Sequence, residues 1–231
     1  MKKKLKKVFI LVNDPIFVYQ HLLPIIDKLK HETSLYIIST YRNQFKLNFK
    51  KVKVIYVPIK REPSFFDIYV FLKFLIIRIK YNPTLCISFT PKAGFINALT
   101  SFLGGKSYHY FTGQRWANLT GLRKILLKFI DKFIIFSCKK VYCDSESQSM
   151  FISKELSVKK IQILGKGSIS GVNINKFNIT KQAALRNLIS INKTQSNNLL
   201  KFLENAKKNR YKIIFFVGRV NKDKGIRELI E

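Results

Sequence analysis

Acidic residues are scarce in this chain of 231 residues, which has 13 Asp and Glu against 43 Lys and Arg and a formal net charge of +30. Such a balance favours anionic partners, so nucleic acid, anionic lipid headgroups and phosphorylated substrates are all candidates. The positive charge is spread along the chain, and no helix-turn-helix, zinc-finger or RNA-binding signature accompanies it. Nucleic acid is therefore the weaker candidate, and we expect no nucleic-acid partner.

Cysteine is also scarce, and the three residues Cys86, Cys138 and Cys143 have no metal-type spacing. An odd number of cysteines in apolar surroundings predicts buried, reduced thiols rather than disulfides. The sequence has no Asp-x-Asp pair that would bind a divalent metal. We therefore expect no metal site and no resident cofactor.

Long uncharged apolar runs are missing as well. The run Val8–Val12 is too short for the core of a signal peptide. No uncharged stretch reaches the roughly 20 residues that a membrane span needs. These absences predict a cytoplasmic protein that rests, at most, on the surface of a membrane.

The first 165 residues alternate apolar runs with amphipathic segments, which is typical of βαβ units and a parallel sheet. This pattern predicts a doubly wound, Rossmann-like α/β domain over residues 1–165, followed by a hinge and connecting segment over 166–210. The predicted strands are Lys7–Val12, Leu35–Thr40, Val52–Val57, Leu85–Phe89, Ser107–Phe111, Lys140–Cys143 and Ile161–Leu164. The predicted helices are Phe17–Lys30, Phe65–Lys80, Ala93–Leu103, Leu122–Phe136 and Gln148–Leu156.

Residues 211–231 have the pattern of the first βα unit of a second α/β domain. Ile213–Val217 is a continuous apolar run, as in a buried parallel strand. Arg219 and Lys224 follow in a basic loop before a helix start, where backbone N–H groups, helix dipole and cations can face one diphosphate. The alternative is a solvated basic loop. Because a nucleotide-binding domain needs about 100 residues, we expect the second domain to be truncated in this chain.

Two polar segments follow predicted strands and mark the ligand-binding edge of the sheet. Thr90-Pro-Lys-Ala-Gly94 opens a helix, so free N–H groups and Lys92 could hold an anion such as the pyrophosphate of an acceptor. An ordinary capped helix start is the alternative.

Gly-x-Gly-x-x-Gly is absent after the first strand, which argues against a dinucleotide-dependent oxidoreductase. Asp14 in that place is a helix cap rather than a ligand.

The second segment is Thr112-Gly-Gln-Arg-Trp116. Gly113 would let a substrate approach the backbone, Gln114 offers a donor and an acceptor to a sugar, and Trp116 could stack on a sugar ring. A core tryptophan is the alternative reading of Trp116. His109, in the preceding strand, is either a site residue or a packed residue that points into the fold.

The helix predicted at 65–80 is apolar all round. We expect the stripe Phe65, Ile68, Tyr69, Leu72, Leu75, Ile76 and Ile79 to pack on the sheet. Phe66, Val70, Phe74 and Ile77, beside Lys73 and Lys80, would then form an outer face suited to anionic headgroups. Burial of that face under another helix is the alternative.

Phe-Val-Gly-Arg-Val-x-x-x-Lys-Gly-Ile-x-x-Leu-Ile, at 216–230, resembles the opening of the nucleotide-sugar-binding domain in retaining family-4 glycosyltransferases of the GT-B fold. Thr90–Gly94, Thr112–Trp116 and Gly165–Asn173 resemble, in order, motifs of the branch that makes capsule, lipopolysaccharide and lipid-linked oligosaccharides. The resemblance extends over nearly the whole chain.

The resemblance implies that Arg219, Lys224, Gly167 and Ser168 bind the diphosphate of a UDP-type donor, and that no metal is needed. It implies an acceptor side at Thr90, Lys92, His109, Gly113, Gln114 and Trp116. The family's paired glutamates would lie past residue 231, so no catalytic residue is assigned.

The expected function is hexosyl transfer from a nucleoside-diphosphate sugar to a lipid-linked saccharide during assembly of a bacterial surface polysaccharide. The enzyme would be peripheral on the inner face of the cytoplasmic membrane, and this chain alone would be inactive. The alternatives are a non-catalytic basic module that binds anionic membrane or nucleic acid, and a GT-B sugar-nucleotide epimerase.

Overall fold

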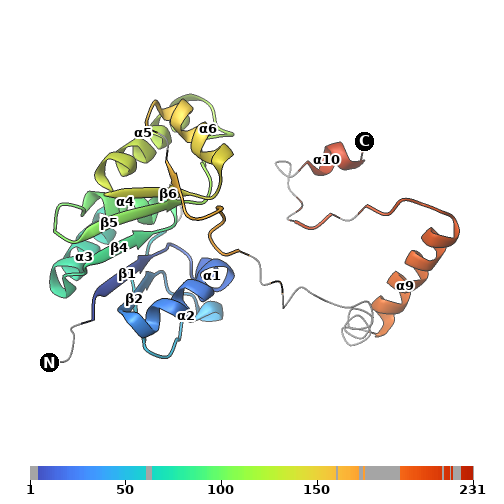
Figure 1. Cartoon of the computed structure of the whole chain (residues 1–231), viewed down its shortest axis with the longest axis horizontal. Coiled ribbons are helices and arrows are strands. Elements are labelled where there is room, and N and C mark those ends of the chain that lie inside the picture. The colour runs from blue at the N-terminus through green and yellow to red at the C-terminus, as the bar shows by residue number, and fades with distance from the viewer. Residues whose placement is uncertain are drawn as a thin grey trace. The chain divides into compact units, whose positions relative to one another are not determined.

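A computed structural model describes residues 5–60, 64–159, 161–171, 174, 193–214, 216–218, 220 and 225–230 of the chain. The chain divides into two compact units, Met1–Gly171 and Val172–Glu231 (Figure 1). The division falls directly after Gly171, the last residue of the Gly/Ser-rich segment Gly165–Gly171.

The first unit is built on a seven-stranded sheet with the order β3-β2-β1-β4-β5-β6-β7. All of its strand pairs are parallel. The predicted doubly wound α/β fold is therefore confirmed, with every predicted strand of this unit present. The strands are β1 Lys7–Leu11, β2 Ser34–Ser39, β3 Val52–Tyr56, β4 Leu85–Ser88, β5 Lys106–Phe111, β6 Lys140–Cys143 and β7 Gln162–Ile163.

Helices cover both faces of this sheet, but to different extents (Figure 1). On one face, the segment from α1 to α2 packs against β1 and β2 through Val18, Leu22 and Ile26. The other face carries α3 and α4 over its centre and α5 and α6 over β5 and β6. The elements are α1 Pro15–Phe17, the π-helix η1 Val18–Leu22, α2 Leu23–Glu32, the 3-10 helix η2 Asn43–Phe45, α3 Phe66–Tyr81, α4 Pro91–Leu99, α5 Gly121–Ser137 and α6 Glu146–Leu156.

The face of α3 that meets the sheet is the opposite of the predicted one. Val70 and Phe74 are fully buried, whereas Ile68, Ile76 and Ile79 are more than 60% exposed, at 64%, 64% and 61%. The prediction that Phe66, Val70, Phe74 and Ile77 form the outer face is therefore wrong. Apolar periodicity could not fix the rotation of a helix that is apolar all round.

A buried arginine accounts for this rotation of α3. Arg78, eight residues after Val70, is only 1% exposed. Its Nη1 donates to Asn97 Oδ1 at 3.1 Å and to Thr100 Oγ1 at 2.9 Å, and its Nη2 donates to Ser107 Oγ at 2.9 Å. Leaving these polar groups unpaired would be costly in the core. The polar partners thus select the face of α3 that contains Arg78.

The second unit contains α9 Lys193–Lys208 and α10 Ile226–Ile230. The strand predicted at Ile213–Val217 is not formed by the residues of that segment that the structure describes, 213, 214, 216 and 217. A strand needs a neighbour to pair its backbone groups, and none of the described residues of this unit forms one. Arg219 and Lys224 lie outside the described residues.

Candidate functional site

The carboxyl ends of the parallel strands meet at one edge of the sheet, and most of the predicted site residues lie there. The strand order reverses between β1 and β4, which is where open α/β sheets form a ligand crevice. At this point Asn13 N–H donates to Thr90 Oγ1 at 3.1 Å and joins the loops that follow the two strands. This hydrogen bond holds the loops after β1 and β4 together at the edge of the sheet.

Thr90 and Lys92 occupy this edge, but both already have partners. Thr90 is the N-cap residue of α4 with an extended backbone, and its side chain makes no capping hydrogen bond. Lys92 Nζ lies 2.7 Å from Asp67 Oδ1 on α3, and the lysine side chain is only 11% exposed. An anion bound at Lys92 would have to compete with this carboxylate.

Gln114 has a side-chain amide with both a hydrogen-bond donor and an acceptor, which are the groups that bind sugars. Its Oε1 accepts from Gln148 Nε2 of α6 at 3.2 Å. Its Nε2 is buried and has no hydrogen-bond partner among the described residues. Such a donor is costly to leave unpaired. Gly113 beside it is open, since no atom lies within 4 Å of where a Cβ would stand.

Trp116 lies in the core, as in the alternative interpretation. It is 1% exposed and stacks on Phe151, with ring centroids 5.2 Å apart. Its Nε1 donates to Asp131 Oδ2 at 2.7 Å. Burial raises the pKa of Asp131 to about 7. The expectation that Trp116 stacks on a sugar does not fit this burial.

His109 is likewise buried, at 1% exposure. Its Nδ1 lies 2.9 Å from Ser88 Oγ, and its ring packs edge-on against Phe111. Burial lowers the pKa of His109 to about 3, so the ring is neutral. A Cβ at Gly94 would stand 2.5 Å from the ring. The structure thus places His109 as a packing residue beneath α4 rather than at the surface of the crevice.

Gly167 and Ser168 lie against the end of β6. A Cβ at Gly167, where φ is +92°, would meet Asp144 O at 2.3 Å, so the close approach of the two loops requires glycine. Ser168 N–H donates to that same carbonyl at 2.8 Å. The position of both residues relative to a bound donor stays a prediction, because their expected partners Arg219 and Lys224 are not described.

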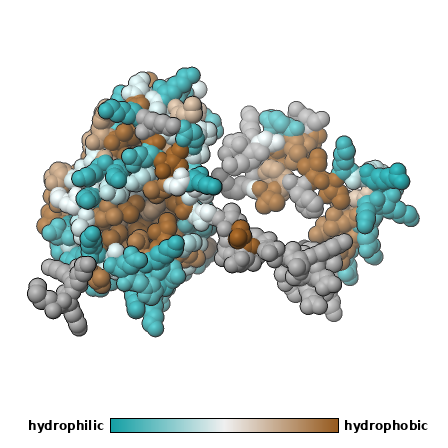
Figure 2. Space-filling model, in the orientation of Figure 1, coloured by the Kyte–Doolittle hydropathy of each residue, from teal (hydrophilic) through white to brown (hydrophobic). Residues whose placement is uncertain are grey.

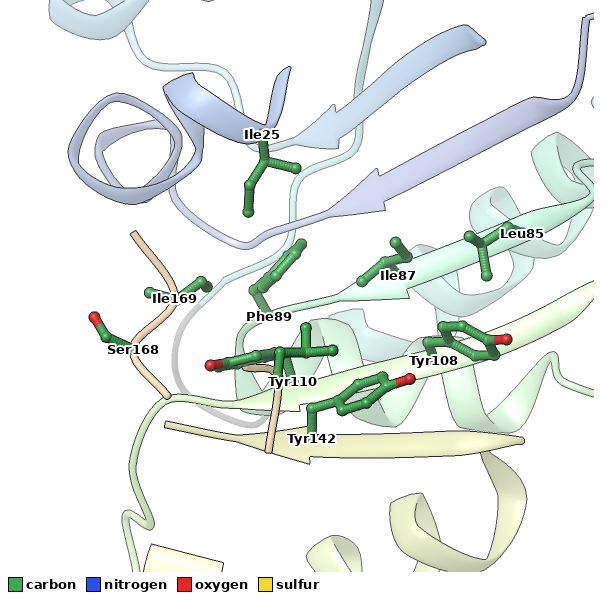
Figure 3. Close-up of a pocket in the computed structure, with 10 residues that line it drawn as sticks. Ile25, Leu85, Ile87, Phe89, Tyr108, Tyr110, Tyr142, Ser168 and Ile169 are labelled. Carbon is green, nitrogen blue, oxygen red and sulfur yellow. The ribbon is translucent and has the colours of Figure 1, made fainter. Parts of the chain in front are cut away.

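Ser168 also borders an apolar hollow of about 460 Å³ on the face of the sheet that carries α2 (Figure 3). Among the described helices of the first unit, none covers this face over β4 and β5 in the view of Figure 1, and the surface there is hydrophobic (Figure 2). None of the described residues that line this hollow is cationic. Its lining is Ile25, Leu85, Ile87, Phe89, Tyr108, Tyr110, Tyr142, Leu164, Ser168 and Ile169.

A second hollow, of about 450 Å³, lies at the carboxyl ends of β1, β2 and β3 and was missed by the sequence analysis. The cations Arg42 and Lys60 are part of its lining. The signal was weak in the sequence because its residues come from three loops without a motif. Its lining is Asn13, Asp14, Thr40, Arg42, Ile59 and Lys60.

Within the described ranges, no three His, Cys, Asp or Glu residues gather as metal ligands would. None of the described helices is both long and apolar enough to cross a membrane.

No family model matches the chain. Over 180 residues it is 29% identical to the capsular polysaccharide biosynthesis glycosyltransferase CapM of Staphylococcus aureus. That match covers 76% of this chain and 43% of CapM, so the chain spans less than half of this relative.

Solved structures show the same fold at low identity. HepE of Anabaena, in complex with UDP, has a TM-score of 0.55 at 13% identity, over 80% of this chain and 49% of HepE. UDP-N-acetylglucosamine 2-epimerase of Rickettsia bellii has a TM-score of 0.53 at 14% identity, over 98% and 67% of the two chains. Sucrose-phosphate synthase of Thermosynechococcus elongatus has a TM-score of 0.52 at 12% identity, over 76% and 53%. These likenesses establish an α/β fold of the GT-B type.

Proposed function

We propose that this chain supplies the acceptor-binding part of a GT-B glycosyltransferase that acts in bacterial surface-polysaccharide assembly. The observation that carries this proposal is the 29% identity with CapM over 180 residues. The parallel sheet and its polar crevice support it, since they give an acceptor a place to bind beside the strand-order reversal. The donor would be a nucleoside-diphosphate sugar, in keeping with the UDP bound in HepE.

The reaction would be a retaining hexosyl transfer of the family-4 type to a lipid-linked saccharide of a capsule or lipopolysaccharide. In this proposal Gln114 Nε2 donates to an acceptor hydroxyl, because it is a buried donor with no partner among the described residues. Arg219 and Lys224 would neutralise the charge that develops on the departing diphosphate, with no metal ion needed.

A transfer assay tests the proposed function. All 231 residues of the chain are joined to the part of CapM that follows the matching region, and radiolabelled nucleoside-diphosphate sugars are supplied with bacterial membranes. We expect label in the lipid fraction from the chimera and none from the 231-residue chain alone. Turnover by the chain alone, or an inactive chimera that is folded and binds UDP, would contradict the proposal.

The roles of Arg219 and Lys224 can be measured in the same chimera. If they stabilise the transition state, Lys224→Ala lowers kcat about a hundredfold or more, as does loss of one oxyanion-hole donor. EDTA should leave the parent activity intact. Near-normal kcat, or EDTA inactivation that a divalent metal reverses, would show that the charge is handled elsewhere.

Location at an anionic membrane is the second part of the proposal, now through the outer face of the α3 to α5 layer. Phe65, the N-cap residue of α3, is 96% exposed, and Ile68 and Ile76 on α3 are each 64% exposed. On α5, Leu122 and Phe129 are 84% and 67% exposed. Apolar patches of this kind beside lysines are suited to the headgroup region on the inner face of a cytoplasmic membrane.

Vesicle sedimentation tests this location. The double variant Ile68→Ser, Ile76→Ser should reduce binding to vesicles that contain anionic lipid, whereas the matched variant Leu5→Ser, Leu23→Ser should not. Salt should weaken binding further, because headgroup attraction is screened. If the two variants sediment alike, the membrane is not bound through α3.

The epimerase alternative is distinguished by product. A GT-B epimerase would convert a free sugar nucleotide without any acceptor, so epimer formation by the chimera in the absence of membranes would favour it. Transfer that requires membranes would exclude it.

A further inference from the structure

The hollow at the ends of β1, β2 and β3 has the donors that an anion needs, on Arg42 and Lys60. Arg42 Nη2 lies 3.3 Å from Asp14 Oδ2, and the arginine side chain is 50% exposed. A guanidinium carries five N–H donors, so this single contact leaves most of them available to a ligand. Lys60 has no acidic partner among the residues that the structure describes. Two cations and one carboxylate thus line the hollow.

The walls of the hollow are fixed by hydrogen bonds that do not use these cations. Thr40 Oγ1 donates to Ile59 O at 3.0 Å, which ties the loop after β2 to the loop after β3. Asp14 Oδ1 accepts from Ile16 N–H at 3.0 Å and so holds the loop after β1. A site that is already ordered loses less entropy when a ligand binds.

The hollow also adjoins the start of the exposed apolar face of α3. Lys60 Nζ lies 5.0 Å from the ring centroid of Phe66, the first residue of that helix. The neighbouring Phe65 is 96% exposed. A cation and apolar side chains are therefore placed side by side, which suits a ligand with a charged head and a lipid tail.

We propose that this hollow binds the phosphate or diphosphate group of a membrane-anchored acceptor, with Arg42 and Lys60 as the binding cations. Phosphate matches the site because it presents several acceptor oxygens to an arginine fork and a lysine point charge. Lys92, which the sequence suggested for this role, is paired with Asp67 at 2.7 Å. The inference rests on the proposed function and assigns the anionic linker of its acceptor to these residues.

Binding of inorganic pyrophosphate to the 231-residue chain tests the site without any sugar transfer. We expect Arg42→Gln, Lys60→Gln to weaken binding about tenfold or more in equilibrium dialysis at low salt, because two charge-assisted contacts are lost. The control Lys28→Gln, Lys53→Gln removes the same charge from exposed lysines elsewhere in the first unit. It should change the affinity by less than about twofold, as expected for distant screened charges.

Asp14→Asn should change the affinity for pyrophosphate in the opposite direction. It removes the carboxylate beside Arg42 while asparagine still caps the helix, so pyrophosphate should bind more tightly. Equal losses in the two double variants, or no gain with Asp14→Asn, would overturn the site.

Vesicles with phosphatidic acid distinguish a lipid phosphate from a free one. The double variant at Arg42 and Lys60 should bind these vesicles more weakly than the control variant does. If only pyrophosphate binding falls, the site takes free phosphate and the membrane-anchored ligand is wrong. Because these readouts need no turnover, an inactive chimera and a failed phosphate site are distinguishable outcomes.

Discussion

Replacing Gly94 by alanine should reveal how tightly α4 is packed on His109. The added Cβ would stand 2.5 Å from His109 Cε1 and 2.7 Å from its Nδ1. The His109 ring cannot easily move aside, because it is buried, hydrogen-bonded to Ser88 and packed against Phe111. Overpacking of this severity costs up to about 3 kcal/mol. Alanine gains about 1 kcal/mol over glycine in a helix, so we expect a net loss of about 2 kcal/mol.

The sign of the effect should reverse when the ring is removed. His109→Ala alone should cost about 2–5 kcal/mol, as large-to-small core changes do. In that background the clash is gone, so Gly94→Ala should stabilise by about 1 kcal/mol through helix propensity. The coupling energy between the two positions is then about 3 kcal/mol, at the upper end for residues in contact.

Equilibrium unfolding in urea, followed by tryptophan fluorescence, measures both effects. Trp116 is the single tryptophan of the chain and is buried in the first unit, so its emission reports on that unit. If Gly94→Ala has the same effect with and without the imidazole ring, then the two residues do not touch as described. His109 would then be free to face the crevice, as the sequence had allowed.

Two further outcomes follow from buried polar groups. Arg78→Met keeps the apolar stem but removes the guanidinium that donates to Asn97, Thr100 and Ser107. The free energy of unfolding, measured in urea, should fall by about 3 kcal/mol. A fall of less than about 1 kcal/mol would mean that water replaces the guanidinium. The pKa of Asp131 is about 7 in the fold, above that of an unfolded aspartate, so its contribution to stability is present at acidic pH and is lost as pH rises toward 7. Asparagine at position 131 can still accept the hydrogen bond from Trp116 but does not titrate. In Asp131→Asn the free energy of unfolding should therefore change less with pH between pH 4 and 8. An unchanged pH dependence would refute the raised pKa of Asp131.

The sequence by itself determined the architecture of the first unit. The predicted strands agree with β1 to β7 within one residue at each end. Continuous apolar runs between amphipathic segments permit little else, because a parallel sheet must be covered on both faces. The sequence also placed Thr90, Gly113 and Gln114 at the ligand edge, since residues that follow parallel strands all meet there.

Tertiary structure decided which side chains are available to a ligand. Periodicity left the rotation of α3 open, and a buried network around Arg78 fixed it. Trp116 and His109 lie in or just after β5, as residues of a ligand site would. Trp116 is nevertheless buried against Phe151, and His109 is buried beneath Gly94 of α4. Arg42 and Lys60 carry no motif, and only the ends of three strands bring them together. The pattern of apolar and polar residues along the chain predicts helices and strands. Contacts between residues that are distant in sequence determine which side chains are exposed, which charges are paired and where pockets form.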